Sequence, residues 1–149
     1  MNREILFKAK RKDNGKWVEG YYCKLDETTY CISEDYERHP VPTHHYILYE
    51  TMTDWGLPNR FLQFEIDHDT LCQYIGLTDK NGQKIWENDV VYARCNGLSG
   101  KGVVQYERGC FVLKDSKRSR TYSLFGEWKF RVDGNIFDNP ELLVGADNG

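Results

Sequence analysis

The sequence predicts a mainly β protein, with a β-rich N-terminal region over residues 1–70 and a small barrel or sandwich over residues 71–149. Aromatic residues make up 14% of the chain, and flat side chains fit the pleated surface of a sheet. Alanine, the strongest helix former, occurs at only three positions. Short apolar stretches are separated by Asn-Gly and other turn dipeptides, which is the spacing of short strands.

The N-terminal region begins with a predicted hairpin. Glu4–Lys10 and Trp17–Cys23 have strand character, and the Asn-Gly dipeptide between them favours a type I′ turn. A third strand is expected at Thr29–Ile32. A symmetric turn before that strand would place Cys31 directly across the ladder from Cys23.

Strand character returns twice before the second region. His45–Tyr49 and Phe61–Ile66 are the two candidate strands, and the segment Thr53–Asn59 between them is irregular. Pro40 and Pro42 interrupt regular structure upstream. We expect the boundary between the two regions near residues 67–71.

The C-terminal region is built from short strands and tight turns. Tyr74–Leu77 and Lys84–Trp86 form a predicted hairpin around an Asn-Gly turn. Asn88 is expected to adopt a left-handed conformation in the bend that follows. Three glycines at 97, 100 and 102 indicate a loose connection. Further strands are expected at Val90–Arg94, Val103–Tyr106, Cys110–Leu113, Thr121–Phe125 and Trp128–Val132, and a short helical turn at Asn139–Leu143.

Composition narrows the class of protein. The net charge is −3 and charges of both signs are spread along the chain, so the totals do not indicate the basic face of a protein that coats nucleic acid. No apolar run reaches the ~18 residues that span a bilayer, and the N-terminus lacks the apolar core of a secretory signal. We therefore expect a cytoplasmic protein with no membrane partner. Five cysteines without a CxxC pair do not fit a disulfide framework or a zinc ribbon.

Three segments carry a resemblance to a known family. They are Arg3–Ala9, Gln73–Val91 and Gly134–Leu143. In their order and spacing the chain resembles the YopX family of bacterial phage and prophage proteins, which usually has Gly where Asn88 stands here. The resemblance implies a β-rich fold with an SH3-like C-terminal part and an origin in a phage or prophage, and hence a location in the cytoplasm of the host bacterial cell. It implies no established catalytic residues.

Metal and nucleophile chemistry has few candidates. His44 and His45 are adjacent, so in a strand they point to opposite faces, while His68 and Cys72 lie in a segment that reads as extended. We therefore expect no metal and no cofactor. The cysteines in strand-like runs are interpreted as buried, inert thiols, with Cys95, beside Arg94, the exception. The residues considered for these roles also include His39, Cys23, Cys31 and Cys110.

Carboxylate pairs are interpreted as structural rather than catalytic. Glu87 and Asp89 flank a bend, where acidic side chains accept hydrogen bonds from backbone N–H groups. Acid/base work would instead need a cleft and one raised pKa. The other pairs considered are Asp67 with Asp69 and Asp133 with Asp138. We therefore expect that the protein is not an enzyme.

Cations and aromatics leave two functions open. A basic hairpin tip is interpreted first as a solvated loop and alternatively as a phosphate-binding tip, and a second basic cluster near residue 10 has the same two interpretations. Aromatics at alternating strand positions favour core packing, although bases also stack on exposed rings. The tip residues are Lys114, Lys117, Arg118 and Arg120; the second cluster is Lys8, Lys10, Arg11 and Lys12; the aromatics are Trp17, Tyr21, Tyr22, Trp86, Tyr92, Tyr106, Phe111, Tyr122 and Trp128.

The sequence favours binding over catalysis. Tyr and Trp on strand edges suit a protein interface. We expect a phage- or prophage-encoded accessory protein that binds an unknown host or phage protein or self-associates as a homo-oligomer. The alternative is a nucleic-acid-binding accessory protein that uses the basic tip.

Overall fold

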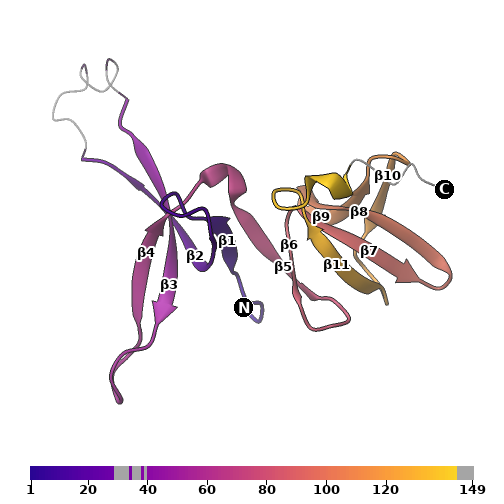
Figure 1. Ribbon diagram of the computed structural model, residues 1–149, viewed down its shortest axis with the longest axis horizontal. Coiled ribbons are helices and arrows are strands. Elements are labelled where there is room, and N and C mark those ends of the chain that lie inside the picture. The colour runs from indigo at the N-terminus through magenta and orange to yellow at the C-terminus, as the bar shows by residue number, and fades with distance from the viewer. Residues whose placement is uncertain (29–33, 35–37, 39, 144–149) are drawn as a thin grey trace. The chain divides into compact units, whose positions relative to one another are not determined.

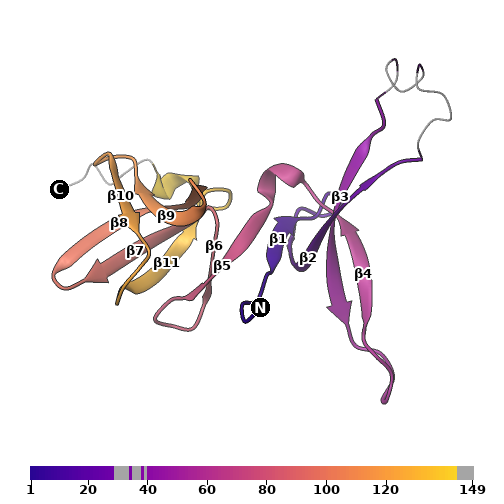
Figure 2. The same ribbon diagram turned by 180° about the vertical axis from the view of Figure 1, so that it is seen from behind.

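The computed structural model describes residues 1–28, 34, 38 and 40–143, and over these residues the protein is mainly β, as predicted. The chain divides into two compact units. The N-terminal unit is Ile5–Leu71, and the C-terminal unit is Met1–Glu4 together with the chain from Cys72 onward. Figures 1 and 2 show both units. The separate domains expected at residues 1–70 and 71–149 stay a prediction.

Four antiparallel strands form the N-terminal unit. They are β1 (Phe7–Lys10), β2 (Trp17–Asp26), β3 (Thr43–Thr51) and β4 (Arg60–Glu65), in the order β4-β3-β2-β1. Past the end of β1 the chain pairs with the end of β4. There the N–H of Lys12 donates to the carbonyl of Glu65 at 3.0 Å, and the N–H of Asp67 donates to that of Lys10 at 2.9 Å. The strands therefore close on themselves at this end.

The closed end of the N-terminal unit holds its core. Ala9, Val18, Ile47 and Ile66 are buried together, and partly buried side chains such as Phe64 pack against them. Full burial of an aliphatic side chain stabilises a fold by about 1.5–3 kcal/mol. The ladder closes here because β1 and the end of β4 both contribute to this core.

Two local predictions for this unit are wrong. Of the Asn-Gly pair only Gly15 has a positive φ, 68°, so the turn is not type I′; instead Asn14 Oδ1 accepts from the N–H of Lys16 at 3.0 Å. The ladder partner of Cys23 is Tyr46, while Cys31 and the strand expected at Thr29–Ile32 lie outside the described residues. The segment from His68 is a 3-10 turn, His68–Thr70, because Asp67 caps it through the N–H of Asp69.

The C-terminal unit combines a hairpin with a five-stranded antiparallel sheet. The hairpin is formed by β5 (Cys72–Thr78) and β6 (Lys84–Trp86), and a 3-10 turn, Pro140–Leu142, lies near the end of the chain. The sheet order begins at β10 and ends at β11, and no pairing of these two strands joins the described residues into a closed barrel. The SH3-like barrel stays a prediction. The sheet strands are β7 (Asp89–Cys95), β8 (Leu98–Glu107), β9 (Cys110–Asp115), β10 (Arg120–Ser123) and β11 (Lys129–Asn135).

The glycine-rich segment after Cys95 is strand rather than the loose connection expected. Asn96 and Gly97 have φ values of 46° and 83°, which is the conformation of a two-residue hairpin turn. Gly100 and Gly102 then continue β8. A Cβ on Gly100 would lie 2.8 Å from Cε2 of Tyr122, so the glycine makes room for that ring against the core. The buried core is Ile85, Val91, Ala93, Val104, Leu113 and Phe130.

Two turn residues join the hairpin to the sheet. Asp79 is only 6% exposed and accepts three backbone hydrogen bonds, from Asn81 at 2.8 Å, Gln83 at 2.9 Å and Val132 at 3.3 Å. The prediction for Asn88 is confirmed, since its φ is 66°. Its backbone N–H donates to the carbonyl of Val104 at 2.8 Å. Both residues therefore fix the geometry of the bends that the sequence places there.

Candidate functional site

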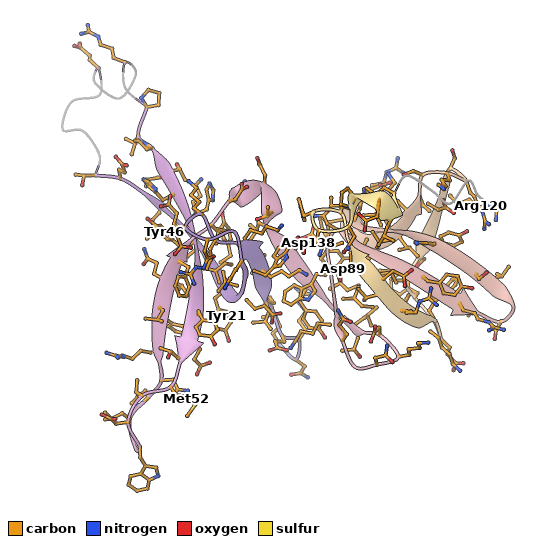
Figure 3. The ribbon with its side chains drawn as sticks, in the orientation of Figure 1. Tyr21, Tyr46, Met52, Asp89, Arg120 and Asp138 are labelled. Atoms are coloured by element: carbon orange, nitrogen blue, oxygen red, sulfur yellow. The ribbon has the colours of Figure 1, made fainter. Side chains whose placement is uncertain are left out.

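The outer part of the β3–β4 hairpin, residues 48–62, exposes large apolar side chains. We call this segment the arm. Trp55 in its connecting loop is fully exposed, at 101% of the reference area. Figure 3 shows Met52 near the end of the arm and Tyr21 farther back on the sheet. The exposed apolar residues of the arm are Tyr49, Met52, Trp55, Leu57, Phe61 and Leu62.

Strand register places apolar groups on both faces of the arm. On one face Phe61 packs edge-on against Tyr21 of β2, with ring centroids 5.8 Å apart. On the other face Tyr49 is the direct cross-strand partner of Leu62. Since the buried core lies toward the closed end of the ladder, these side chains remain exposed. An exposed apolar surface of this kind is typical of a protein interaction site.

Histidines lie on both faces of the same sheet, as their adjacency predicted. His44 Nδ1 is 2.9 Å from Glu65 Oε1, and its Nε2 is 2.8 Å from Glu27 Oε1. These hydrogen bonds, that to Glu65 first, raise the pKa of His44. On the opposite face Nδ1 of His45 is 2.6 Å from the hydroxyl oxygen of Tyr22, and burial, followed by the charge of His68, lowers the pKa of His45.

The candidate metal and nucleophile residues do not converge in the part of the chain that the structure describes. No group of three His, Cys, Asp or Glu side chains among those residues is placed to hold a metal ion. His39 and Cys31 lie outside the described residues. Cys72 is buried, as expected, but Cys110 is exposed at the start of β9, so the expectation of a buried thiol there is wrong. Cys23 and Cys95 are half-buried.

The carboxylates at the bend before β7 accept hydrogen bonds from backbone N–H groups. Glu87 Oε1 accepts from the N–H of Gln73 at 2.9 Å, and Asp89 Oδ2 accepts from the N–H of Trp86 at 2.9 Å. Burial raises the pKa of Glu87, against the opposing effect of the Gln73 hydrogen bond. The expectation that both side chains accept hydrogen bonds from backbone N–H groups is therefore confirmed.

A groove of about 490 Å³ lies on the C-terminal unit. Its lining comes from β7, β8, β9, the β9–β10 turn and the 3-10 turn near residue 140. Tyr92 is the cross-strand partner of Lys101, and Val103 is that of Lys114. Neighbouring positions Val91, Ala93 and Val104 belong to the core. Because strand residues alternate between faces, the groove occupies the face of the sheet that points away from the core.

Comparison with known proteins identifies the family. The family model described as YopX protein matches residues 6–144. The chain belongs to the YopX family.

A solved structure supports the fold of this YopX-family chain. The crystal structure of protein EF1440 from Enterococcus faecalis is similar to it, with a TM-score of 0.51 and 17% sequence identity, over 95% of this chain and 99% of that one. At this identity the likeness concerns the fold alone. No curated protein matches the sequence.

Among the described residues of this YopX-family chain no helix has the length and apolarity needed to cross a membrane.

The structure separates the four cations predicted at the basic tip. Lys114, Lys117 and Arg118 line the groove, whereas Arg120 lies on β10 and is not part of the lining. Lys101 joins the groove although sequence analysis missed it. Lys101 lies between Gly100 and Gly102, and this alternation could have indicated a strand. The glycine-rich segment was instead interpreted as a loop.

The second basic cluster of this YopX-family chain is engaged in packing. Lys8 Nζ lies 4.7 Å from the centre of the Trp17 ring, and the guanidinium of Arg11 lies 3.9 Å from that of Phe64. Lys12 Nζ is 3.2 Å from Glu65 Oε1. These contacts favour a structural role for the cluster, since its charges lie over rings or beside a carboxylate of its own unit.

Proposed function

We propose that this YopX-family protein is a non-enzymatic module that binds protein, and that the arm makes the contact. The observation that supports the proposal is the fully exposed Trp55 at the end of a hairpin with apolar side chains on both faces. Trp and Tyr are enriched among the residues that dominate the energetics of protein interfaces. The phage or prophage origin and the cytoplasmic location belong to the same proposal.

Self-association is the form of the proposal that the arm favours. One face of the arm carries Phe61, which packs against Tyr21 of β2, and the other face carries Tyr49 and Leu62. Two such arms packed together would bury in each copy an apolar face that is exposed in the single chain. The gain would be about 25 cal/mol for each Å² of apolar surface removed from water, before the costs of association.

Sedimentation velocity over a range of protein concentrations tests self-association through the arm. We expect the wild-type mass to rise with concentration, and the double variant Trp55→Ser with Phe61→Ser to stay monomeric. The matched control is Leu98→Ser, which removes an exposed apolar side chain from the C-terminal unit and should associate like the wild type. A wild type that stays monomeric throughout would contradict self-association.

The same variants test the alternative that the arm binds a host or phage protein. Tagged wild-type protein and the Trp55→Ser, Phe61→Ser variant are used to capture proteins from phage-infected cells. We expect a partner that is retained by the wild type and by Leu98→Ser and is lost with the arm variant. Capture that is identical for all three proteins would mean that the arm is not the binding surface.

A further inference from the structure

The groove on the C-terminal unit has a strongly cationic rim. Four of its lining side chains, Lys101, Lys114, Lys117 and Arg118, are cations, and Asp115 is the one carboxylate among the described lining residues. The rim is formed by β8, β9 and the turn after β9, so residues up to seventeen positions apart in the sequence meet at one opening. A cationic rim attracts an anionic ligand.

The turn that carries Lys117 and Arg118 is held in place by Asp115. Oδ1 of this carboxylate accepts from the N–H of Lys117 at 3.1 Å and from that of Arg118 at 3.2 Å. Asp115 is buried, and Arg118 Nε is 4.0 Å from its Oδ2. The carboxylate of Asp115 therefore fixes the backbone of the turn. This turn holds Lys117 and Arg118 at the rim of the groove.

The other two cations have acidic neighbours that lie outside the lining. Lys114 Nζ is 2.6 Å from Glu107 Oε2, and Lys101 Nζ is 3.5 Å from Asp133 Oδ2. Asp133 is shared with Arg131, whose Nε is 2.7 Å from its Oδ1. Lys101, Lys114 and Glu107 each keep more than a third of the side chain exposed, whereas Asp133 keeps 19%. Ion pairs that solvent reaches contribute little stability. Lys101 and Lys114 are thus oriented by these pairs and remain available to a stronger anion such as a phosphate.

The floor of the groove is apolar and includes a ring. Val90, Ile136 and Leu142 line it together with Tyr92, and the guanidinium of Arg131 lies 4.9 Å from the centre of the Tyr92 ring. The ligand that fits is therefore flat and partly apolar at one end and anionic at the other. A nucleotide has this chemistry, and a groove of about 490 Å³ falls within the ~300–1,000 Å³ of small-molecule sites.

We propose that the groove binds single-stranded nucleic acid, with one nucleotide seated against Tyr92 and its phosphates at Lys114, Lys117 and Arg118. A strand fits better than a free nucleotide because the four cations of the groove exceed what a single phosphate would engage. Single-strand binders combine a positive groove with aromatic side chains on which bases stack. This site lies on a different unit from the arm and does not depend on the protein-binding proposal.

Fluorescence anisotropy with labelled oligo-dT and oligo-U of about twelve nucleotides tests the site, because single-strand sites cover roughly 4–16 nucleotides. The variant is Lys117→Glu with Arg118→Glu. The control is Lys80→Glu with Lys129→Glu, which makes the same charge change at exposed positions outside the groove lining. We expect binding by the wild type and the control, and loss of binding by the variant. Equal weakening of variant and control would show non-specific attraction and overturn the site.

The salt dependence gives a quantitative check with the milder variant Lys117→Ala with Arg118→Ala. Each phosphate contact adds about 0.7 to the slope of log affinity against log salt for single strands, so losing two contacts lowers the slope by about 1.4. Between about 50 and 200 mM salt the wild type should therefore lose about sevenfold more affinity than this variant. Identical slopes would contradict the assignment of these two cations.

Two further measurements separate this ligand from others. Duplex DNA of the same length and free dTMP should each bind more weakly than the single strand, and equal binding of either would overturn the proposal. Backbone NMR shifts on adding oligo-dT to the wild-type protein should concentrate at residues 90–92, 99–103 and 114–118. Shifts confined to other parts of the chain would place the ligand elsewhere, whatever the variants do.

Discussion

Replacing Asp79 with Ala should destabilise the C-terminal unit more than any exposed acidic substitution. Its carboxylate accepts three backbone hydrogen bonds, two within the β5–β6 turn and one from Val132 on β11. The side chain is buried, so its loss leaves the three N–H groups without this acceptor. An unsatisfied buried donor costs about 1–3 kcal/mol. Because solvent reaches part of the turn, we expect a total loss of about 3 kcal/mol.

Urea unfolding followed by tryptophan fluorescence measures the effect. Trp86 and Trp128 belong to the C-terminal unit, so the measurement is made in a Trp17→Phe, Trp55→Phe background in which emission comes from this unit alone. With a slope near 1.5 kcal/mol/M, a loss of 3 kcal/mol lowers the midpoint by about 2 M. Glu127→Ala, at an exposed position of the same unit, should shift the midpoint by less than about 0.3 M. Equal shifts for the two variants would refute the hydrogen-bond argument.

The pH dependence of the Asp79 effect has a defined sign. Burial acts to raise the pKa of Asp79, but the hydrogen bonds from Gln83, Val132 and Asn81 outweigh it, and the pKa is lowered. A lowered pKa contributes stability that is present above the unfolded-state value, near 3.9, and is lost as the pH falls through the folded-state value. The stability difference between wild type and Asp79→Asn should therefore be constant from about pH 7 to 5 and shrink below about pH 4. A difference that grows on acidification would refute the reasoning.

Three further substitutions test other parts of the fold. Asn88→Ala should cost about 1–2 kcal/mol in urea unfolding because its φ is 66°, whereas Asn88→Gly should be nearly neutral. Gly20→Ala should destabilise the N-terminal unit in thermal unfolding, since the new Cβ would overlap the Leu48 carbonyl oxygen and lie 3.0 Å from its carbon; unchanged melting would mean that β2 and β3 separate easily. The raised pKa of His44 predicts stabilisation that is complete below about pH 6.5 and is lost as the pH rises through the folded-state value, and His44→Gln should abolish this dependence in unfolding measured from about pH 6 to 8.

Local turn chemistry explains which parts of the fold the sequence predicts well. Asn88 and the Asn-Gly turn after Asp79 adopt the bends expected, because backbone preferences of Asn and Gly act over a few residues. The pairing of the chain beyond β1 with the end of β4 was not predicted. A backbone pairing between residues more than fifty positions apart cannot be predicted from the four residues of a turn. The same applies to Cys23, whose partner Tyr46 lies beyond two prolines.

Burial was harder to predict than strand position. Tyr21 and Trp86 both lie in strands and both were interpreted as core residues, yet Trp86 is buried while Tyr21 is exposed. The alternation of a strand specifies that residues share a face, but it does not specify which face is covered. In the arm no described residue packs over Tyr49 or Phe61 fully enough to bury them. Sequence analysis therefore predicted exposed aromatics as a class without locating them at the β3–β4 hairpin.

The groove shows why a run of cations in the sequence is a poor guide to a binding site. Register, rather than proximity in sequence, decides which charges share a face: Val103 pairs with Lys114, and Tyr92 pairs with Lys101, so Lys101 and Lys114 lie together although thirteen positions separate them. Arg120 is closer in sequence to Lys117 but follows the turn onto β10 and leaves the lining. If the groove binds nucleic acid, Lys101→Ala should therefore weaken binding more than Arg120→Ala. The opposite order would mean that a flexible basic tip, and not the face of the sheet, makes the contact.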